Sequence, residues 1–159
     1  EELLIEIATK LDKYSFTFVS QLPRLKNLNL PNVEVISGKW GDENLDDNAL
    51  KEIYLNSRLC ILPLKNSTQP SGQSVSLQCM SLGIPVMISK TDGFWDSDKF
   101  VDELNILMIE NNTNEWIENI ESSFSNLNKL NSISYEAKKT VKDEFNLIKF
   151  HKKLLEFIG

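Results

Sequence analysis

The sequence predicts an α/β fold built on a doubly wound parallel sheet, with helices on both faces. Short apolar runs alternate along the 159 residues with segments whose apolar side chains recur at helical spacing. The runs at 59–64 and 86–88 hold only apolar residues, as is typical of parallel strands that are buried on both faces. A chain of this length fits one domain with a sizeable core, so residues 1–159 are expected to form a single domain.

The first half of the chain opens with an amphipathic helix. Leu3, Leu4, Ile7, Ala8 and Leu11 recur at helical spacing and predict a helix over 2–12. The predicted elements that follow are a strand at 15–20, an irregular connection at 21–31 that contains two prolines, a strand at 32–37, a polar loop at 39–44 and a helix capped by Asp46 or Asp47.

The second half contains three further strands and most of the helical residues. The expected order is strand 59–64, helix 74–82, strand 85–89, an irregular segment over 91–103, a brief strand at 106–109 and three helices to the end. Asn112, with Glu115 three residues later, resembles a capping box at the start of the first of these helices. The last helix, 147–158, is amphipathic, and its aromatic face is expected to pack on another domain. Lys149, Lys152 and Lys153 are expected to form a solvated face, with a membrane-surface role as the alternative.

The order of elements is unusual at its start, because doubly wound folds normally open with a strand. A strand before Glu1 would belong in the centre of the usual strand order, between the strands at 15–20 and 59–64. Without it, two strand edges would be exposed. We therefore expect the chain to be part of a longer polypeptide, lacking its first strand and an N-terminal partner domain.

Composition excludes several classes of function. A formal net charge of −6 argues against a nucleic-acid surface. The single histidine, His151, has no nearby Cys or His, so no metal site is expected. Cys60 and Cys79 lie in apolar runs and are expected to be buried, reduced thiols, as in a cytoplasmic protein. No apolar run is long enough to span a membrane.

The most informative stretch runs from Gln69 to Val86. A Pro/Ser/Gly loop follows one apolar strand. A short helical pattern comes next, and Gly83 and Pro85 end it before the following strand. In an open α/β sheet this loop lies at the carboxyl edge, where helix N-termini and free backbone amides gather. The loop is therefore either a phosphate-binding turn or a plain strand–helix connection without a ligand.

The order of elements, the loop Pro70–Ser74, the segment Leu77–Val86 and the later Asp92-Gly93 resemble the C-terminal domain of a GT-B glycosyltransferase. The group that is most similar is the retaining group 1, or family 4, type, and the resemblance covers almost the whole chain. It implies a Rossmann-like domain that binds a nucleotide-diphosphate sugar as donor substrate, with no metal or other cofactor. The fragment alone is expected to be inactive.

The resemblance also implies site residues. The diphosphate is expected at Gly72, Gln73 and Ser74, the ribose at Gln78, and the sugar between Ser71, Asp92 and Gly93. The base is expected near Gly38, Lys39 and Trp40, where Trp40 either stacks on the base or simply covers the sheet edge.

The sequence departs from the family pattern at two positions of this site. The family carries two glutamates eight residues apart, and Pro70 and Gln78 stand in their places. Gln78 can still hydrogen-bond a ribose, whereas Pro70 offers no polar side chain. The catalytic residues therefore stay unassigned.

The resulting hypothesis is the donor-binding half of a retaining hexosyltransferase in carbohydrate biosynthesis, acting on an unknown acceptor. A non-catalytic Rossmann-like module for nucleotide binding or protein interaction is the alternative. A nucleotide-sugar epimerase of the same architecture is a third, although it would need more acidic and histidine residues.

Overall fold

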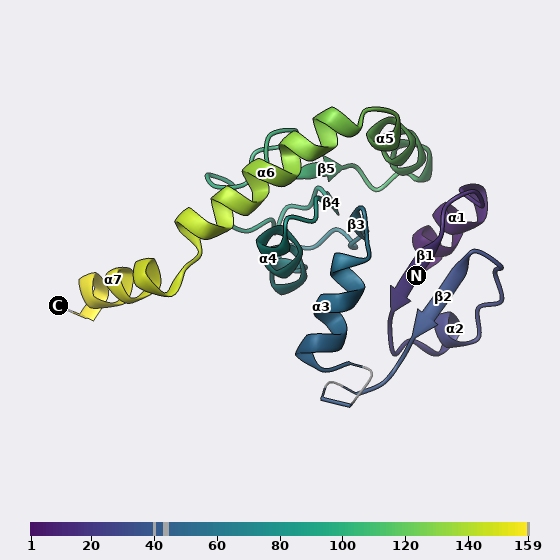
Figure 1. The fold of residues 1–159 in the computed structure, drawn as a ribbon, viewed down its shortest axis with the longest axis horizontal. Helices are drawn as coiled ribbons and strands as arrows, with labels where there is room; N and C mark the ends of the chain where they lie inside the picture. The colour runs from purple at the N-terminus through teal and green to yellow at the C-terminus, as the bar shows by residue number, and fades with distance from the viewer. Residues whose placement is uncertain (40, 43–44, 159) are drawn as a thin grey trace.

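The computed structural model describes residues 1–39, 41–42 and 45–158 (Figure 1). The elements are α1 (Glu2–Lys10), β1 (Phe16–Val19), α2 (Pro23–Lys26), β2 (Val33–Ile36), α3 (Asp47–Leu55), β3 (Cys60–Leu62), α4 (Gln73–Leu82), β4 (Val86–Ser89), β5 (Leu107–Ile109), α5 (Thr113–Ser125), α6 (Leu127–Glu144) and α7 (Leu147–Ile158). Every predicted strand is present. The one addition is α2, because Pro23 occupies its first turn, where the fixed φ of proline favours a helix.

All strand pairs are parallel, which confirms the predicted α/β class, but the strands form two sheets. β1 pairs with β2, and β4 lies between β3 and β5. β1 and β3 do not pair with each other. The break falls between β1 and β3.

The three-stranded sheet is packed on both faces. On one face, Trp116 and Ile120 of α5 join Ile7 of α1 and Met87 of β4 in an apolar cluster. On the other, α4 and α6 pack on the sheet, and Phe100 lies in the cluster that they enclose. All four residues of β4 are buried, so β4 is the central strand of the described fold.

The two-stranded sheet has a smaller core. Its buried members are Ala8 of α1, Phe18 of β1 and Leu25 of α2. The Asn32 amide donates to the backbone oxygens of Ala8 (2.9 Å) and Tyr14 (3.1 Å), and so ties the end of α1 to the start of β2. α1 also packs on α5, which links this half to the rest of the fold.

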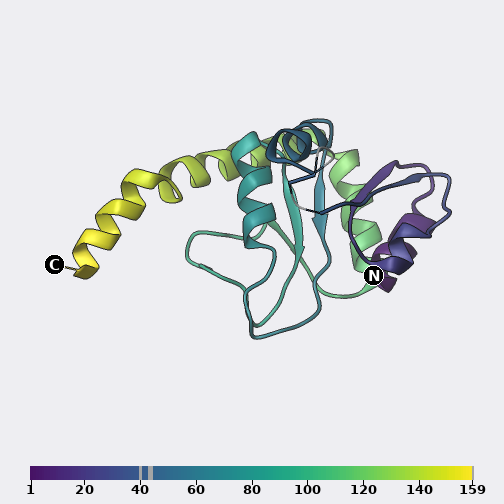
Figure 2. The same cartoon turned by 90° about the horizontal axis from the view of Figure 1, so that it is seen from below.

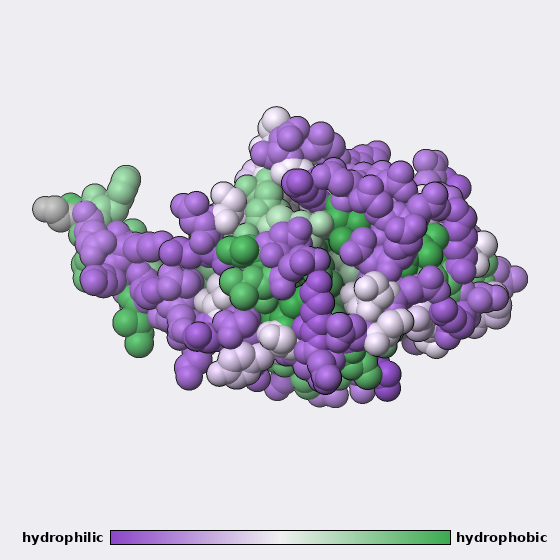
Figure 3. Space-filling model, turned by 90° about the horizontal axis from the view of Figure 1, so that it is seen from above, coloured by the Kyte–Doolittle hydropathy of each residue, from purple (hydrophilic) through white to green (hydrophobic). Residues whose placement is uncertain are grey.

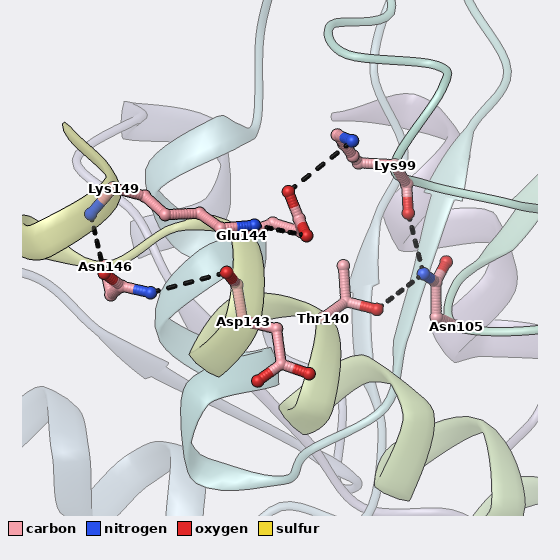
Figure 4. A network of polar contacts seen from close by, with 7 residues as sticks. All are labelled: Lys99, Asn105, Thr140, Asp143, Glu144, Asn146 and Lys149. Atoms are coloured by element: carbon pink, nitrogen blue, oxygen red, sulfur yellow. Dashed lines mark hydrogen bonds and ion pairs between the residues drawn. The ribbon is translucent and has the colours of Figure 1, made fainter. Parts of the chain in front are cut away.

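The last helix, α7, has no buried residue in the described chain and projects from the end of α6 (Figures 1 and 2). Its apolar side chains are visible at the left of Figure 3, away from the main body. Glu144 forms ion pairs with Lys149 (2.6 Å) and Lys99 (3.5 Å) where α6 meets α7 (Figure 4). Within the described residues, no helix combines the length and apolar character needed to cross a membrane.

Candidate functional site at the carboxyl edge of the strands

The loops that follow the strands and the first turns of α4 carry the described residues that the sequence predicts for the site. Gly38 and Lys39 follow β2, the segment Ser71–Ser74 follows β3, and Asp92 and Gly93 follow β4. In parallel α/β folds this edge holds the ligand, because helix N-termini point toward it. The structure therefore brings the predicted residues to one edge of the fold.

The N-terminus of α4 is the best-formed part of this edge. Gly72 precedes the helix in a left-handed conformation (φ 78°). A Cβ at Gly72 would lie 3.1 Å from Ile88 Cδ1 and 3.3 Å from Leu64 Cδ1, so the left-handed conformation favours glycine and a side chain there would also crowd two apolar neighbours.

Three backbone donors are free at this helix end. Among the residues that the structure describes, no acceptor pairs with the N–H groups of Gln73, Ser74 or Val75, whereas the N–H of Ser76 donates to the Gly72 oxygen at 2.9 Å. Free N–H groups combined with the helix dipole suit an anion such as a phosphate.

Buried polar contacts fix the end of the strand before this loop. Ser89 Oγ accepts a hydrogen bond from the Leu64 N–H (2.8 Å) and donates to Asn111 Oδ1 (2.6 Å), while the Asn111 amide donates to the Leu64 oxygen. The ends of β3, β4 and β5 are thereby tied together. Neither Ser89 nor Asn111 is predicted from the sequence, although a serine directly after the apolar run 86–88 is an available signal.

Asp92 and Gly93 hold the same loop from the side. Gly93 is buried, and a Cβ there would lie 2.6 Å from the Ser67 backbone oxygen and from the Thr68 backbone carbon. The backbone N–H of Asp92 donates to Asn66 Oδ1 and the Asn66 amide donates to Asp92 Oδ2, both at 3.2 Å. Asp92 and Gly93 thus help to fix the position of the loop after β3. Their predicted contact with a sugar stays a prediction.

Gln78 lies one helical turn beyond Ser74, and both side chains are exposed on α4. The hydroxyl of Tyr54, on α3, donates to Gln78 Oε1 at 3.2 Å. The Tyr54 hydroxyl is protonated at neutral pH and can donate, and burial raises its pKa further, to about 12. Gln78 is thus oriented with its amide N–H groups available for a ligand hydroxyl.

The predicted base-binding residues lie on the other sheet. The Lys39 N–H donates to Asp42 Oδ2 (2.8 Å), and the Gln21 amide donates to the Gly38 oxygen. A small pocket of about 200 Å³ lies beside Gly38 at the ends of β1 and β2. This volume is below the ~300–1,000 Å³ of ordinary ligand pockets. Trp40 lies outside the described residues.

The two thiols are free, as the sequence predicts. Cys79 is buried, but Cys60 is only half-buried, because β3 is at the edge of its sheet. A hydrogen bond with Cys60, together with burial, raises the pKa of the Cys79 thiol, so it is a poor nucleophile. The described part of the chain contains no group of three or more His, Cys, Asp or Glu side chains arranged to hold a metal ion.

The fold is that of the C-terminal domain of a GT-B glycosyltransferase, as the sequence predicts. A glycosyltransferase from Rickettsia africae matches 98% of this chain and 42% of its own at 19% identity, with a TM-score of 0.75. The C-terminal domain of the group 1 glycosyltransferase LpcC from Francisella tularensis matches 92% of this chain and 79% of its own at 16% identity, with a TM-score of 0.68.

A third solved structure contains a nucleotide. HepE from Anabaena, in complex with UDP, matches 99% of this chain and 44% of its own at 15% identity, with a TM-score of 0.75. The chain thus spans less than half the length of the R. africae and HepE proteins. No protein-family model matches the sequence, and no curated protein matches it. At these identities the similarity establishes the fold.

Proposed function

We propose that the chain is the donor-binding domain of a retaining glycosyltransferase, which transfers a hexosyl unit from a nucleotide-diphosphate sugar to an acceptor. The observation that carries the proposal is the set of free N–H groups at the N-terminus of α4, behind a glycine in the left-handed conformation. The same fold occurs in HepE structures that contain UDP or UDP-glucose, which supports a nucleotide sugar as the ligand.

Each part of the site has a defined task in this proposal. The diphosphate accepts hydrogen bonds from the N–H groups of Gln73 and Ser74, and the helix dipole stabilises its charge. Gln78, held by Tyr54, donates to the ribose. The base lies toward Gly38 and Lys39. The sugar extends toward Ser71 and the segment that contains Asp92 and Gly93.

Catalysis would depend on stabilisation of charge on the departing diphosphate. Negative charge develops on the leaving group as its bond to the sugar breaks, and donors that are already oriented stabilise it without reorganisation. The helix N-terminus provides such donors without a metal ion. The described residues assign no catalytic acid or base, and Pro70 offers no polar side chain beside the sugar. The free thiols at Cys60 and Cys79 support a cytoplasmic location.

Calorimetric titration of the full-length protein with UDP, GDP and ADP tests the proposed site. We expect one of these nucleotides to bind, and Gly72→Ala to weaken that binding about tenfold or more, which corresponds to about 1.4 kcal/mol. Gly83→Ala is the matched control, because Gly83 ends the same helix with nearly the same φ (81°) but lies at its opposite end. Equal affinities for the two variants would count against the loop as the diphosphate site.

A non-catalytic nucleotide-binding module is the second candidate. It is favoured by Pro70 and Gln78, which stand where the resemblance implies two acids. The two functions differ in turnover. A glycosyltransferase releases nucleotide from its sugar donor when an acceptor is present, whereas a binding module takes up the nucleotide sugar and leaves it intact.

A further inference from the structure

A hydrogen bond between α3 and α4 lies beside the diphosphate loop. The Tyr54 hydroxyl, on α3, donates to Gln78 Oε1, on α4, at 3.2 Å. Ser74 and Gln78 are four residues apart, so their side chains share one face of α4 and are separated by ~6 Å along its axis. Tyr54, Ser74 and Gln78 also line the same cavity. The contact is therefore one helical turn away from the free N–H groups of the loop.

The ring of Tyr54 is held in place by packing. It is only partly exposed, and it packs against the apolar cluster that contains Cys79 and Met80 of α4. Cys60 and Cys79 lie near its hydroxyl, but a thiol is a weak hydrogen-bond acceptor. Among the residues that the structure describes, Gln78 is the one partner that accepts from this hydroxyl. Tyr54 thus brings a donor to a fixed position beside α4.

The side chain of Gln78, in contrast, is exposed and is oriented by this contact alone. Within the described chain its amide makes no hydrogen bond other than the one with Tyr54. A glutamine amide has an oxygen that accepts and an NH₂ group that donates. Because Tyr54 holds the oxygen on the side of α3, the NH₂ group is the end of the side chain that is left for a ligand.

We propose that Tyr54 is a positioning residue that determines the direction of the hydrogen bond to the ribose. It fixes Gln78 so that a ribose oxygen must accept a hydrogen bond from the NH₂ group. The carboxylate that the resemblance implies at position 78 does the opposite, since its two oxygens only accept. The proposal rests on the proposed function, because it requires a nucleotide at the N-terminus of α4.

The specificity that follows differs from that of an acid at position 78. A ribose oxygen that carries a methyl group has no proton to donate, but it can still accept from the NH₂ group of Gln78. The site should therefore bind an O-methyl nucleotide better than the corresponding deoxynucleotide, which lacks the oxygen. A carboxylate would gain nothing from the methylated oxygen. The ligand class is thus a nucleotide that presents a ribose oxygen as a hydrogen-bond acceptor.

Calorimetry of the full-length protein tests the role of Tyr54. The ligands are whichever of UDP, GDP and ADP binds most tightly, together with its 2′-deoxy and 3′-deoxy forms. Tyr54→Phe keeps the ring and removes the donor. We expect it to weaken binding of the ribonucleotide about two- to tenfold, because the released Gln78 side chain must then be immobilised on binding. The deoxynucleotide that lacks the contacted oxygen should bind equally well to both proteins.

Further variants separate positioning from a purely structural role. In a Gln78→Ala background, Tyr54→Phe should have no additional effect on the affinity for the ribonucleotide. Tyr135→Phe is the matched control, because it removes a hydroxyl from an exposed tyrosine of α6 and should leave every affinity unchanged. An equal loss for the ribonucleotide and both deoxynucleotides in Tyr54→Phe would overturn the proposal, as would a loss that persists in the Gln78→Ala background.

Gln78→Glu tests the direction of the hydrogen bond. Gln78 is exposed, so the substitution changes the hydrogen-bonding groups with little change in packing. In the wild type, we expect the nucleotide that is O-methylated at the contacted oxygen to bind about two- to tenfold more tightly than the deoxynucleotide. This advantage should disappear in Gln78→Glu. A wild type that binds the O-methyl nucleotide no better than the deoxynucleotide would contradict the proposed direction.

The same titrations distinguish a failure of this proposal from a failure of the proposed function. If none of the three nucleotides binds, both are overturned. If a nucleotide binds and Gly72→Ala weakens its binding, the diphosphate site is supported. In that case, a Tyr54→Phe variant that still distinguishes ribonucleotide from deoxynucleotide as strongly as the wild type overturns the role of Tyr54 alone.

Discussion

The two halves of the molecule, one around each sheet, differ in how firmly they are held. The half with β3, β4 and β5 has apolar clusters on both faces of its sheet, and Ser89 and Asn111 tie its strand ends together. The half with β1 and β2 has three buried apolar residues of its own and is linked to the rest through α1 and α3.

The proposed site is divided in the same way. The diphosphate loop belongs to the three-stranded half, and the base region at Gly38 belongs to the two-stranded half. The loop can therefore be positioned by local packing alone.

The largest expected effect distinguishes the cores of the two halves. Trp116 is fully buried between α5 and the three-stranded sheet, so Trp116→Ala should lower the free energy of unfolding by about 3–5 kcal/mol. Leu25→Ala, in the small core, should cost about 2–5 kcal/mol and should release the β1 and β2 amides without exposing β4. Urea unfolding and amide exchange measure both. Equal loss of protection in both sheets for Leu25→Ala would contradict the difference between the halves.

A smaller effect is expected at the loop. Gly93→Ala places a methyl group within 2.6 Å of the backbone at Ser67 and Thr68, so the loop must move. We expect a loss of stability of about 1–3 kcal/mol and weaker nucleotide binding. Gly38→Ala is the control for stability, because a Cβ there meets only side-chain atoms, the nearest at 3.3 Å. Unchanged binding in Gly93→Ala would mean that loop position does not depend on this contact.

Substitutions at the N-cap of α3 test this helix, which is one of the connections between the halves. Asp46 Oδ1 accepts a hydrogen bond from the Ala49 N–H at 2.7 Å, which confirms Asp46 rather than Asp47 as the cap. Asp46→Ala should therefore cost about 0.5–2 kcal/mol. Asp47→Ala should cost distinctly less, as thermal denaturation can measure. The reverse order would contradict the assignment.

The smallest effect is a pH dependence at the junction of α6 and α7. The ion pairs with Lys149 and, secondarily, Lys99 hold the pKa of Glu144 below its ordinary value of 4.5. Because the pKa of Glu144 is lower in the folded state, its ionised carboxylate stabilises the folded junction above pH 4.5. This contribution is lost as the pH falls through the pKa of Glu144 in the folded state. We expect NMR order parameters in α7 to fall over that range. Glu144→Gln should have low order parameters at every pH, and a pH-independent wild type would contradict the role of the pair.

The sequence predicts the elements well, because the strands are apolar runs and the helices are amphipathic. The helix α2 was missed because two prolines suggested an irregular connection, whereas Pro23 starts a helical turn. Asn112 caps α5 through its side-chain oxygen, which accepts from the N–H groups of Asn114 and Glu115. The predicted capping box is not completed, because the Asn112 N–H donates to the Glu110 oxygen at 2.7 Å.

The supporting contacts of the site could not be read from local patterns. Ser89 and Asn111 lie 22 residues apart, and Gly93 touches a loop more than 20 residues earlier in the chain. The hydrogen bond between Tyr54 and Gln78 likewise joins two helices. Periodicity identifies the elements, and the contacts between the ends of those elements appear only in three dimensions.

The most direct test of the nucleotide site is NMR of the full-length protein with labelled backbone amides, titrated with the nucleotide that calorimetry selects. We expect the amide protons of Gln73 and Ser74 to shift downfield as they donate to the diphosphate, with Val75 affected less. The corresponding nucleoside, which lacks phosphates, should leave these amides in place. Nucleotide binding without any change at Gln73 and Ser74 would contradict the central claim that the N-terminus of α4 binds the diphosphate.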